Sequence, residues 1–316
     1  MLKEAIEYLR PQAGQVIVDC TLGGGGYTKE IAKKVGAKGK VIAIDADELS
    51  THNAQRITRN EKINNVIIVN DNFKHLQNII QENELEAVDG LVADLGLSSA
   101  QLQDRNRGFS FGLDAPLNMA FNNKDESEKT LEIINKYSKE KLVEIIKNFG
   151  EERYADRIAG AIVQTRKSLE TMHSRRRSAP VIRTAKQLAD IITQSVPASY
   201  RHSRINPATR TFQALRIATN NELKNLKALL EQSVPALNQG GRVVIISYHS
   251  LEDRIVKQFF KQESKDCICP SAMPICQCQH QAQLKIITKK IITPSLEEIK
   301  QNPRARSAKM RVAERV

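Results

Sequence analysis

Four consecutive glycines, Gly23 to Gly26, follow Asp19 and could hold a ligand close to the backbone. Glycine adopts positive φ and allows such an approach. Asp45 follows 19 residues after Gly26, and a carboxylate there can accept both ribose hydroxyl protons. A nicotinamide dinucleotide would call for G-x-G-x-x-G with a pyrophosphate on the helix N-terminus. The pattern here is D-x-T-x-G-x-G-G, which favours S-adenosylmethionine, a ligand without a phosphate.

Polar residues end four short apolar runs in the first third of the chain. The runs and the residues after them are 16–18 before Asp19, 40–44 before Asp45, 66–69 before Asn70 and 89–93 before Asp94. Stretches 27–35 and 46–60 between them are typical of helices. This alternation predicts an α/β fold with a mostly parallel, Rossmann-like sheet. Ligands of such sheets bind at the carboxyl ends of the strands, where these polar residues are expected.

The strand pattern stops near Arg107 and resumes at residues 242–247. Helical patterns fill the interval, at 131–149, 151–167 and 185–196, and the stretch 305–312 could form a last strand. We therefore predict a core in two parts, 1–107 and 207–316. An all-helical domain for substrate recognition, 108–206, is inserted between them.

The formal net charge of +12 indicates a polyanionic partner, with a merely soluble surface as the alternative. Arg175, Arg176 and Arg177 form a basic run inside the insertion, and a charge run is either a solvated face or a phosphate contact. No apolar run approaches the roughly 20 residues of a membrane helix. Residues 1–10 contain Glu4 and Glu7 without a long apolar stretch, so no secretory signal is expected. These features favour nucleic acid over membrane as partner, and the cytoplasm as location.

Five cysteines are present, and four of them cluster near the C-terminus as Cys267, Cys269, Cys276 and Cys278. In a reducing compartment such a cluster favours thiols or metal ligands over disulfides. The spacing is C-x-C-x6-C-x-C, whereas structural zinc sites prefer C-x2–4-C pairs. The spacing therefore disfavours a metal, and zinc binding by these four cysteines stays open as the alternative.

Six long strings of the sequence are distinctive. They are Asp89-Gly-Leu-Val-Ala-Asp-Leu-Gly-Leu-Ser-Ser-Ala-Gln101, Arg107-Gly-Phe-Ser-Phe111, Asp114-Ala-Pro-Leu117, Asn206-Pro-Ala-Thr-Arg-Thr-Phe-Gln-Ala-Leu-Arg216, Ile246-Ser-Tyr-His-Ser-Leu-Glu-Asp-Arg254 and Asn302-Pro-Arg-Ala-Arg-Ser-Ala-Lys309. In these strings the chain resembles the MraW (RsmH) family of bacterial 16S rRNA cytosine-N4 methyltransferases, and the similarity covers nearly the whole chain.

This resemblance implies a class I S-adenosylmethionine-dependent methyltransferase. It also implies N4-methylation of cytidine 1402 of 16S rRNA, at the decoding site of the small ribosomal subunit. An assembled subunit is the expected substrate. Whether the protein is a monomer or a homodimer stays open. The implied cofactor contacts are Gly25, Gly26, Tyr27, Asp45, Phe73, Asp94 and Gln101. Tyr27 stands where the family usually has His.

Asp94 is the candidate catalytic residue, because cytosine N4 is a weak nucleophile whose N–H protons need an acceptor. The alternative is that Asp94 contacts only the cofactor. Asn206, Arg210 and His249 are candidate substrate contacts, and each has a structural alternative. Asn206 and Arg210 could tie the insertion to the core, and His249 could orient its loop. Ser250 to Asp253 has the S-x-x-D form of a helix cap.

Three rival functions follow from the same sequence. A DNA amino-methyltransferase is disfavoured because Asp94-Leu-Gly-Leu97 lacks the Pro-Pro-aromatic segment of such enzymes. A dehydrogenase is disfavoured by the glycine pattern. A non-catalytic RNA-binding factor for ribosome assembly, retaining the methyltransferase fold, remains as the alternative.

Overall fold

The computed structural model of the chain describes residues 1–112, 114–121, 130–172, 182–203, 205–270, 273 and 275–316. It divides into two compact units, one formed by Met1–Gly96 with Leu223–Val316 and the other by Leu97–Glu222. We call them the sheet unit and the helical unit. The helical unit is longer at both ends than the insertion predicted at 108–206.

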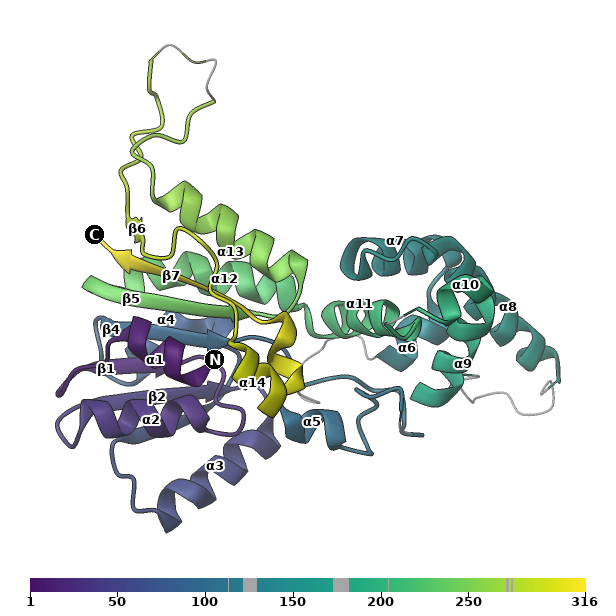
Figure 1. Ribbon diagram of the computed structural model, residues 1–316, viewed down its shortest axis with the longest axis horizontal. Coiled ribbons are helices and arrows are strands. Elements are labelled where there is room, and N and C mark those ends of the chain that lie inside the picture. The colour runs from purple at the N-terminus through teal and green to yellow at the C-terminus, as the bar shows by residue number, and fades with distance from the viewer. Residues whose placement is uncertain (113, 122–129, 173–181, 204, 271–272, 274) are drawn as a thin grey trace. The chain divides into compact units, whose positions relative to one another are not determined.

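The sheet unit contains a seven-stranded sheet of order β3-β2-β1-β4-β5-β7-β6, in which β1 lies between β2 and β4 (Figure 1). The five strands from β3 to β5 are parallel, and β7 is antiparallel to both of its neighbours. The strands are β1 Val16–Asp19, β2 Lys40–Asp45, β3 Val66–Asn70, β4 Val88–Asp94, β5 Leu237–Ser247, β6 Leu284–Ile286 and β7 Lys309–Arg315. The predicted mostly parallel sheet is confirmed, and its strand order reverses at β1, where such folds bind ligands.

Helices cover both faces of this sheet, which explains why its strands are continuous apolar runs. Val243 and Ile245 of β5 join one apolar cluster with α4, α12 and α13, whereas Val244 and Ile246 join another with α1 and α2. The helices of the unit are α1 Leu2–Leu9, α2 Gly26–Val35, α3 Glu48–Asn60, η1 Phe73–His75, α4 Leu76–Glu82, α12 Glu222–Ala236, α13 Ser250–Glu263, α14 Leu296–Gln301 and η2 Pro303–Ser307.

The helical unit has its own apolar core. It contains α5 Ser99–Gln103, α6 Thr130–Lys136, α7 Lys139–Gly150, α8 Ala155–Met172, α9 Ala185–Ser195, α10 Ala198–Arg201 and α11 Ala208–Asn220. Phe212 and Leu215 of α11 are buried in this core, so α11 does not belong to the returning core segment predicted from residue 207.

The single helix predicted over 131–149 is wrong. Two helices, α6 and α7, occupy this stretch, because the Ser138 side chain accepts the Lys141 N–H at 3.3 Å and starts a new helix. The helix predicted over 151–167 is observed as α8, shifted to 155–172. The stretch predicted as one helix is therefore two, and α8 differs from its prediction only at its ends.

Candidate active site

Three carboxylates mark one edge of the sheet. Asp19, Asp45 and Asp94 are the last residues of β1, β2 and β4, three parallel neighbours, and so lie at the edge where these strands end. We call it the carboxyl edge. The sequence placed these residues at strand ends, and the structure confirms that placement.

Asp19 holds the turn that follows β1. Its side chain is fully buried, accepts the Thr28 hydroxyl at 2.6 Å and accepts the Thr21 N–H at 3.1 Å. Burial raises the pKa of Asp19 to about 6, and the bond from Thr28 partly offsets this. Thr21 in turn accepts the Asp94 N–H on its hydroxyl at 2.7 Å, which ties the ends of β1 and β4 together.

The glycine turn needs glycine for conformation and leaves open space beside it. Gly23 and Gly25 have φ of 46° and 76°, in the left-handed region. A Cβ atom added at Gly24 or Gly26 would meet nothing within 4 Å. Gly25 is the N-cap of α2 and provides no side-chain cap, which leaves the first amides of that helix to other acceptors. The turn therefore suits a ligand lying along the backbone.

The Asp45 side chain is held in place by hydrogen bonds from the backbone. Its two carboxylate oxygens accept the N–H groups of Gly23 and Asp47, both at 2.8 Å. Burial raises the pKa of Asp45 to about 6, and these two bonds lower it. Because each carboxylate oxygen can accept more than one hydrogen bond, Asp45 retains capacity for a diol.

Asp94 lies between two tyrosines. The Tyr248 hydroxyl donates to Asp94 Oδ1 at 2.9 Å, and a side-chain hydrogen bond from Tyr27 also lowers the pKa of Asp94. Burial outweighs both and raises that pKa to about 6, so the carboxyl group is mostly ionised at neutral pH. The pKa values of both tyrosines are raised above their usual range, chiefly by burial, which keeps the hydroxyls protonated as donors.

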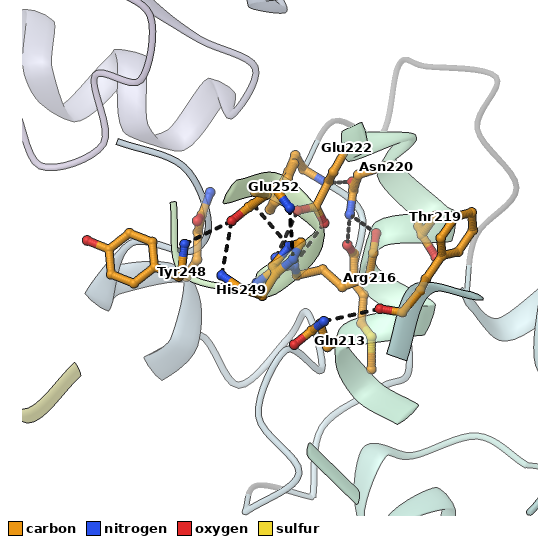
Figure 2. Close-up of polar contacts among 12 residues, drawn as sticks. Gln213, Arg216, Thr219, Asn220, Glu222, Tyr248, His249 and Glu252 are labelled. Carbon is orange, nitrogen blue, oxygen red and sulfur yellow. Dashed lines mark hydrogen bonds and ion pairs between the residues drawn. The ribbon is translucent and has the colours of Figure 1, made fainter. Parts of the chain in front are cut away.

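Sequence analysis did not identify Tyr248 or Glu252 as part of the site. Glu252 is buried, and its Oε2 accepts the Tyr248 N–H at 2.9 Å and the His249 N–H at 3.4 Å (Figure 2). It thereby fixes the turn between β5 and α13 from which Tyr248 reaches Asp94. Tyr248 lies inside the string Ile246 to Arg254, so that string was the available signal.

The predicted S-x-x-D cap at Ser250 is wrong. The N-cap of α13 is His249, whose Nδ1 accepts the Glu252 N–H at 3.4 Å, while Glu252 completes the capping box. Asp253 instead accepts from Arg311 at 2.7 Å. His249 thus orients its own loop, as one alternative held, and its Nε2 lies 3.1 Å from Glu252 Oε1. A contact between His249 and the substrate stays a prediction.

The other candidates lie on defined elements. Phe73 is in η1, after β3, and packs partly buried against the core of the sheet unit. Gln101 is buried in the helical unit, where its side-chain oxygen accepts the Ser98 N–H at 2.9 Å and caps α5. Asn206 accepts the Ala208 N–H at 2.8 Å, and Arg210 donates to the Glu151 carbonyl at 2.7 Å. These bonds are internal to the helical unit.

The remaining candidate substrate contacts are Arg175, Arg176 and Arg177, and they lie outside the described residues. A salt bridge within the helical unit joins Arg216 and Glu222. The Arg216 side chain donates two hydrogen bonds of 2.8 Å each to the Glu222 carboxylate (Figure 2). Within the described ranges, every helix is too short or too polar to cross a membrane.

Comparison with known proteins gives a match over the full length. A ribosomal RNA small subunit methyltransferase H from Dehalococcoides mccartyi is 47% identical over 317 residues, covering 100% of this chain and 85% of that protein. The protein of the same name from Halothermothrix orenii is 44% identical over 316 residues, covering 100% of this chain and 97% of that protein. Among solved structures, an rRNA methylase from Streptococcus thermophilus aligns at 10% identity with a TM-score of 0.42. The alignment covers 100% of this chain and 93% of that one. The sequence profile of the MraW methylase family matches residues 1–316, and the chain belongs to that family.

Proposed function

We propose that this protein transfers a methyl group from S-adenosylmethionine to the exocyclic N4 of a cytidine in 16S rRNA, cytidine 1402 in the family's numbering of the RNA. The observation that carries the proposal is the position of Asp94, at the end of β4, hydrogen-bonded by Tyr248 and Tyr27. The names of the relatives at 47% and 44% identity support small-subunit rRNA as substrate.

The residues at the carboxyl edge fit this cofactor. Asp45, with its remaining acceptor capacity, would bind the ribose hydroxyls. The open backbone at Gly24 and Gly26 would allow the cofactor to lie against the turn. When bound, S-adenosylmethionine supplies an electrophilic methyl group on a sulfonium ion, which needs no phosphate cradle.

Asp94 would accept a proton from the attacking amine. The N4 lone pair of cytosine is delocalised into the ring, so the amine gains nucleophilicity only as it loses its proton. A pKa of about 6 leaves Asp94 ionised at neutral pH yet close enough to that pH for efficient proton transfer. Tyr27 and Tyr248, as donors, would hold the carboxylate in one orientation.

The target base must be unstacked to reach such a site, and the helical unit is the proposed platform for the surrounding RNA. The net charge of +12 supports a polyanionic partner. We propose the assembled small subunit in the cytoplasm as substrate, because a platform of this size exceeds what one flipped nucleotide needs.

The test is mass spectrometry of 16S rRNA after incubation with wild-type protein or with Asp94→Asn. Free 16S rRNA and small subunits lacking the modification serve as parallel substrates. The wild type should add one methyl group to a cytidine N4, and Asp94→Asn should lower the rate by about 10²–10⁴ with little change in calorimetric affinity for S-adenosylmethionine.

Other outcomes would change the assignment. An unchanged rate in Asp94→Asn would remove the proton-acceptor role, and a methyl group on another atom would correct the specificity. Binding to rRNA without any affinity for S-adenosylmethionine would favour a non-catalytic assembly factor.

A further inference from the structure

A segment of the sheet unit projects away from its sheet between α13 and β6, described over residues 264–270, 273 and 275–283 (Figure 1). We call it the extension. Its described apolar side chains are largely exposed: Ile268 by 41%, Met273 by 43% and Ile275 by 74%. None of these three belongs to an apolar cluster of the protein, so hydrophobic burial contributes little to the fold of the extension.

Four thiols meet in this extension. The Sγ atoms of Cys267, Cys269, Cys276 and Cys278 all lie within 4.8 Å of one another. Two of the separations are 3.6 Å, between Cys276 and Cys278, and 3.8 Å, between Cys278 and Cys267. Zinc binds thiolate sulfur at about 2.3 Å in a tetrahedron, whose edges are then about 3.8 Å. These two separations match the edges of a tetrahedral zinc site, and the other sulfur atoms lie within 4.8 Å.

The spacing C-x-C, which argued against zinc in the sequence, has a geometric explanation. In extended backbone, residues i and i+2 point to the same side. Neither pair lies in a helix, and the Sγ atoms of Cys276 and Cys278 lie 3.6 Å apart, so the two thiols of that pair share one side. Two such pairs, Cys267 with Cys269 and Cys276 with Cys278, face each other across the extension and form the four-thiol group.

Backbone amides already point at the sulfur atoms. The Ile268 N–H donates to Cys278 Sγ, and the Gln277 N–H donates to Cys269 Sγ, each at 3.4 Å. Each bond runs from one C-x-C pair to the other. Such outer bonds stabilise thiolates and orient them as metal ligands.

The base of the extension is closed without help from the thiols. The Gln283 N–H donates to the Glu263 carbonyl at 2.8 Å, and His280 Nδ1 lies 2.8 Å from the Lys265 carbonyl oxygen. His280 Nε2 lies 3.4 Å from the Glu263 carboxylate. These contacts hold the two ends of the extension together. They reduce the conformational entropy that the segment would lose when its four thiols bind an ion.

We propose that Cys267, Cys269, Cys276 and Cys278 bind one structural zinc ion, which holds the extension in a single conformation. Four sulfur ligands close the coordination sphere, so the site has no open position for catalysis. Zinc is favoured over an iron–sulfur cluster, because the four sulfur atoms are close enough for one metal atom and a cluster would spread them over several. The site is separate from the carboxyl edge and makes no use of Asp94.

The test is elemental analysis of the full-length protein, purified in reducing buffer without a metal-affinity tag and then incubated with zinc chloride and desalted. Wild type should retain one zinc per chain. The double variant Cys276→Ser/Cys278→Ser should retain none, and its extension should be cleaved faster by a nonspecific protease. The matched control is Ile275→Ser, which changes an exposed side chain of the same extension and should keep the zinc.

Calorimetry with S-adenosylmethionine distinguishes loss of the ion from loss of the fold, since the double variant should bind the cofactor as wild type does. Thiol titration adds a second readout: zinc should protect four thiols, and a chelator should expose them. Zinc-free protein after incubation, a mass lower by four hydrogens from two disulfides, or a visible iron absorbance with iron in place of zinc would each overturn the proposal.

Discussion

At the scale of single residues, the site combines groups that are costly to bury. Asp19, Asp45 and Asp94 all have a pKa of about 6, raised chiefly by burial. Each is held by donors, which are the backbone for Asp45, Thr28 for Asp19 and Tyr248 for Asp94. Stability does not explain why three carboxylates are buried at one edge, because burying a charge lowers the stability of the fold. Their cost is consistent with a binding role.

Tyr248→Phe tests how Asp94 is controlled. The Tyr248 hydroxyl lowers the pKa of Asp94, so its removal should raise that pKa above about 6. The acid limb of the pH profile of kcat/KM should move to higher pH, with a larger loss of methylation at pH 6 than at pH 8. Tyr8→Phe removes a hydroxyl elsewhere in the sheet unit and should leave the limb in place. An equal loss at every pH would show that Tyr248 acts only through packing.

Asp19→Asn tests the energetic cost of burial. The pKa of Asp19 in the folded protein is about 6, against an ordinary 3.8, so the stability linked to its protonation is complete below pH 3.8 and is lost as pH rises through 6. Asn does not titrate. Relative to wild type, the variant should therefore gain up to about 3 kcal/mol in free energy of unfolding between pH 4 and pH 7. Urea denaturation at both values measures this, and a difference independent of pH would contradict it.

At the scale of elements, the sequence predicts strands better than it predicts their partners. The runs before Asp19, Asp45 and Asp94 are strands with consecutive buried side chains, which lie on both faces of the sheet, and the run before Asn70 is a strand whose apolar side chains are half-buried. The Tyr248–Asp94 bond joins residues 154 positions apart, and no local pattern encodes such a contact. The cap of α13 was misplaced because S-x-x-D and the observed H-x-x-E overlap, offset by one residue.

Helix packing in the helical unit gives a matched pair of glycine variants. A Cβ at Gly150, the last residue of α7, would lie 2.5 Å from the Arg210 carbonyl oxygen of α11. Gly150→Ala should therefore lower the free energy of unfolding by about 1–3 kcal/mol. A Cβ at Gly160 of α8 would meet nothing closer than 3.6 Å, so Gly160→Ala should raise it by up to about 1 kcal/mol. Thermal unfolding compares them, and equal effects would contradict the close approach of α7 to α11.

At the scale of the whole molecule, charge governs the encounter with RNA. The net charge of +12 predicts affinity that falls as salt rises. Replacing Arg175, Arg176 and Arg177 by Ala should weaken rRNA binding and lower the slope of log affinity against log salt by up to about 2–3 units, as for three lost phosphate contacts. Filter binding over a salt series measures the slope. Affinity for S-adenosylmethionine should not change, and an unaltered slope would assign these arginines to a solvated face.

The interruption between β4 and β5 also has a kinetic consequence. These strands pair directly, Asp94 beside Ile246, yet all of the helical unit lies between them in the chain. Closing so long a loop costs entropy that grows with the logarithm of its length. Early folding of the inserted helices would shorten the effective tether, so a destabilising substitution in the core of the helical unit should also slow the pairing of β4 with β5.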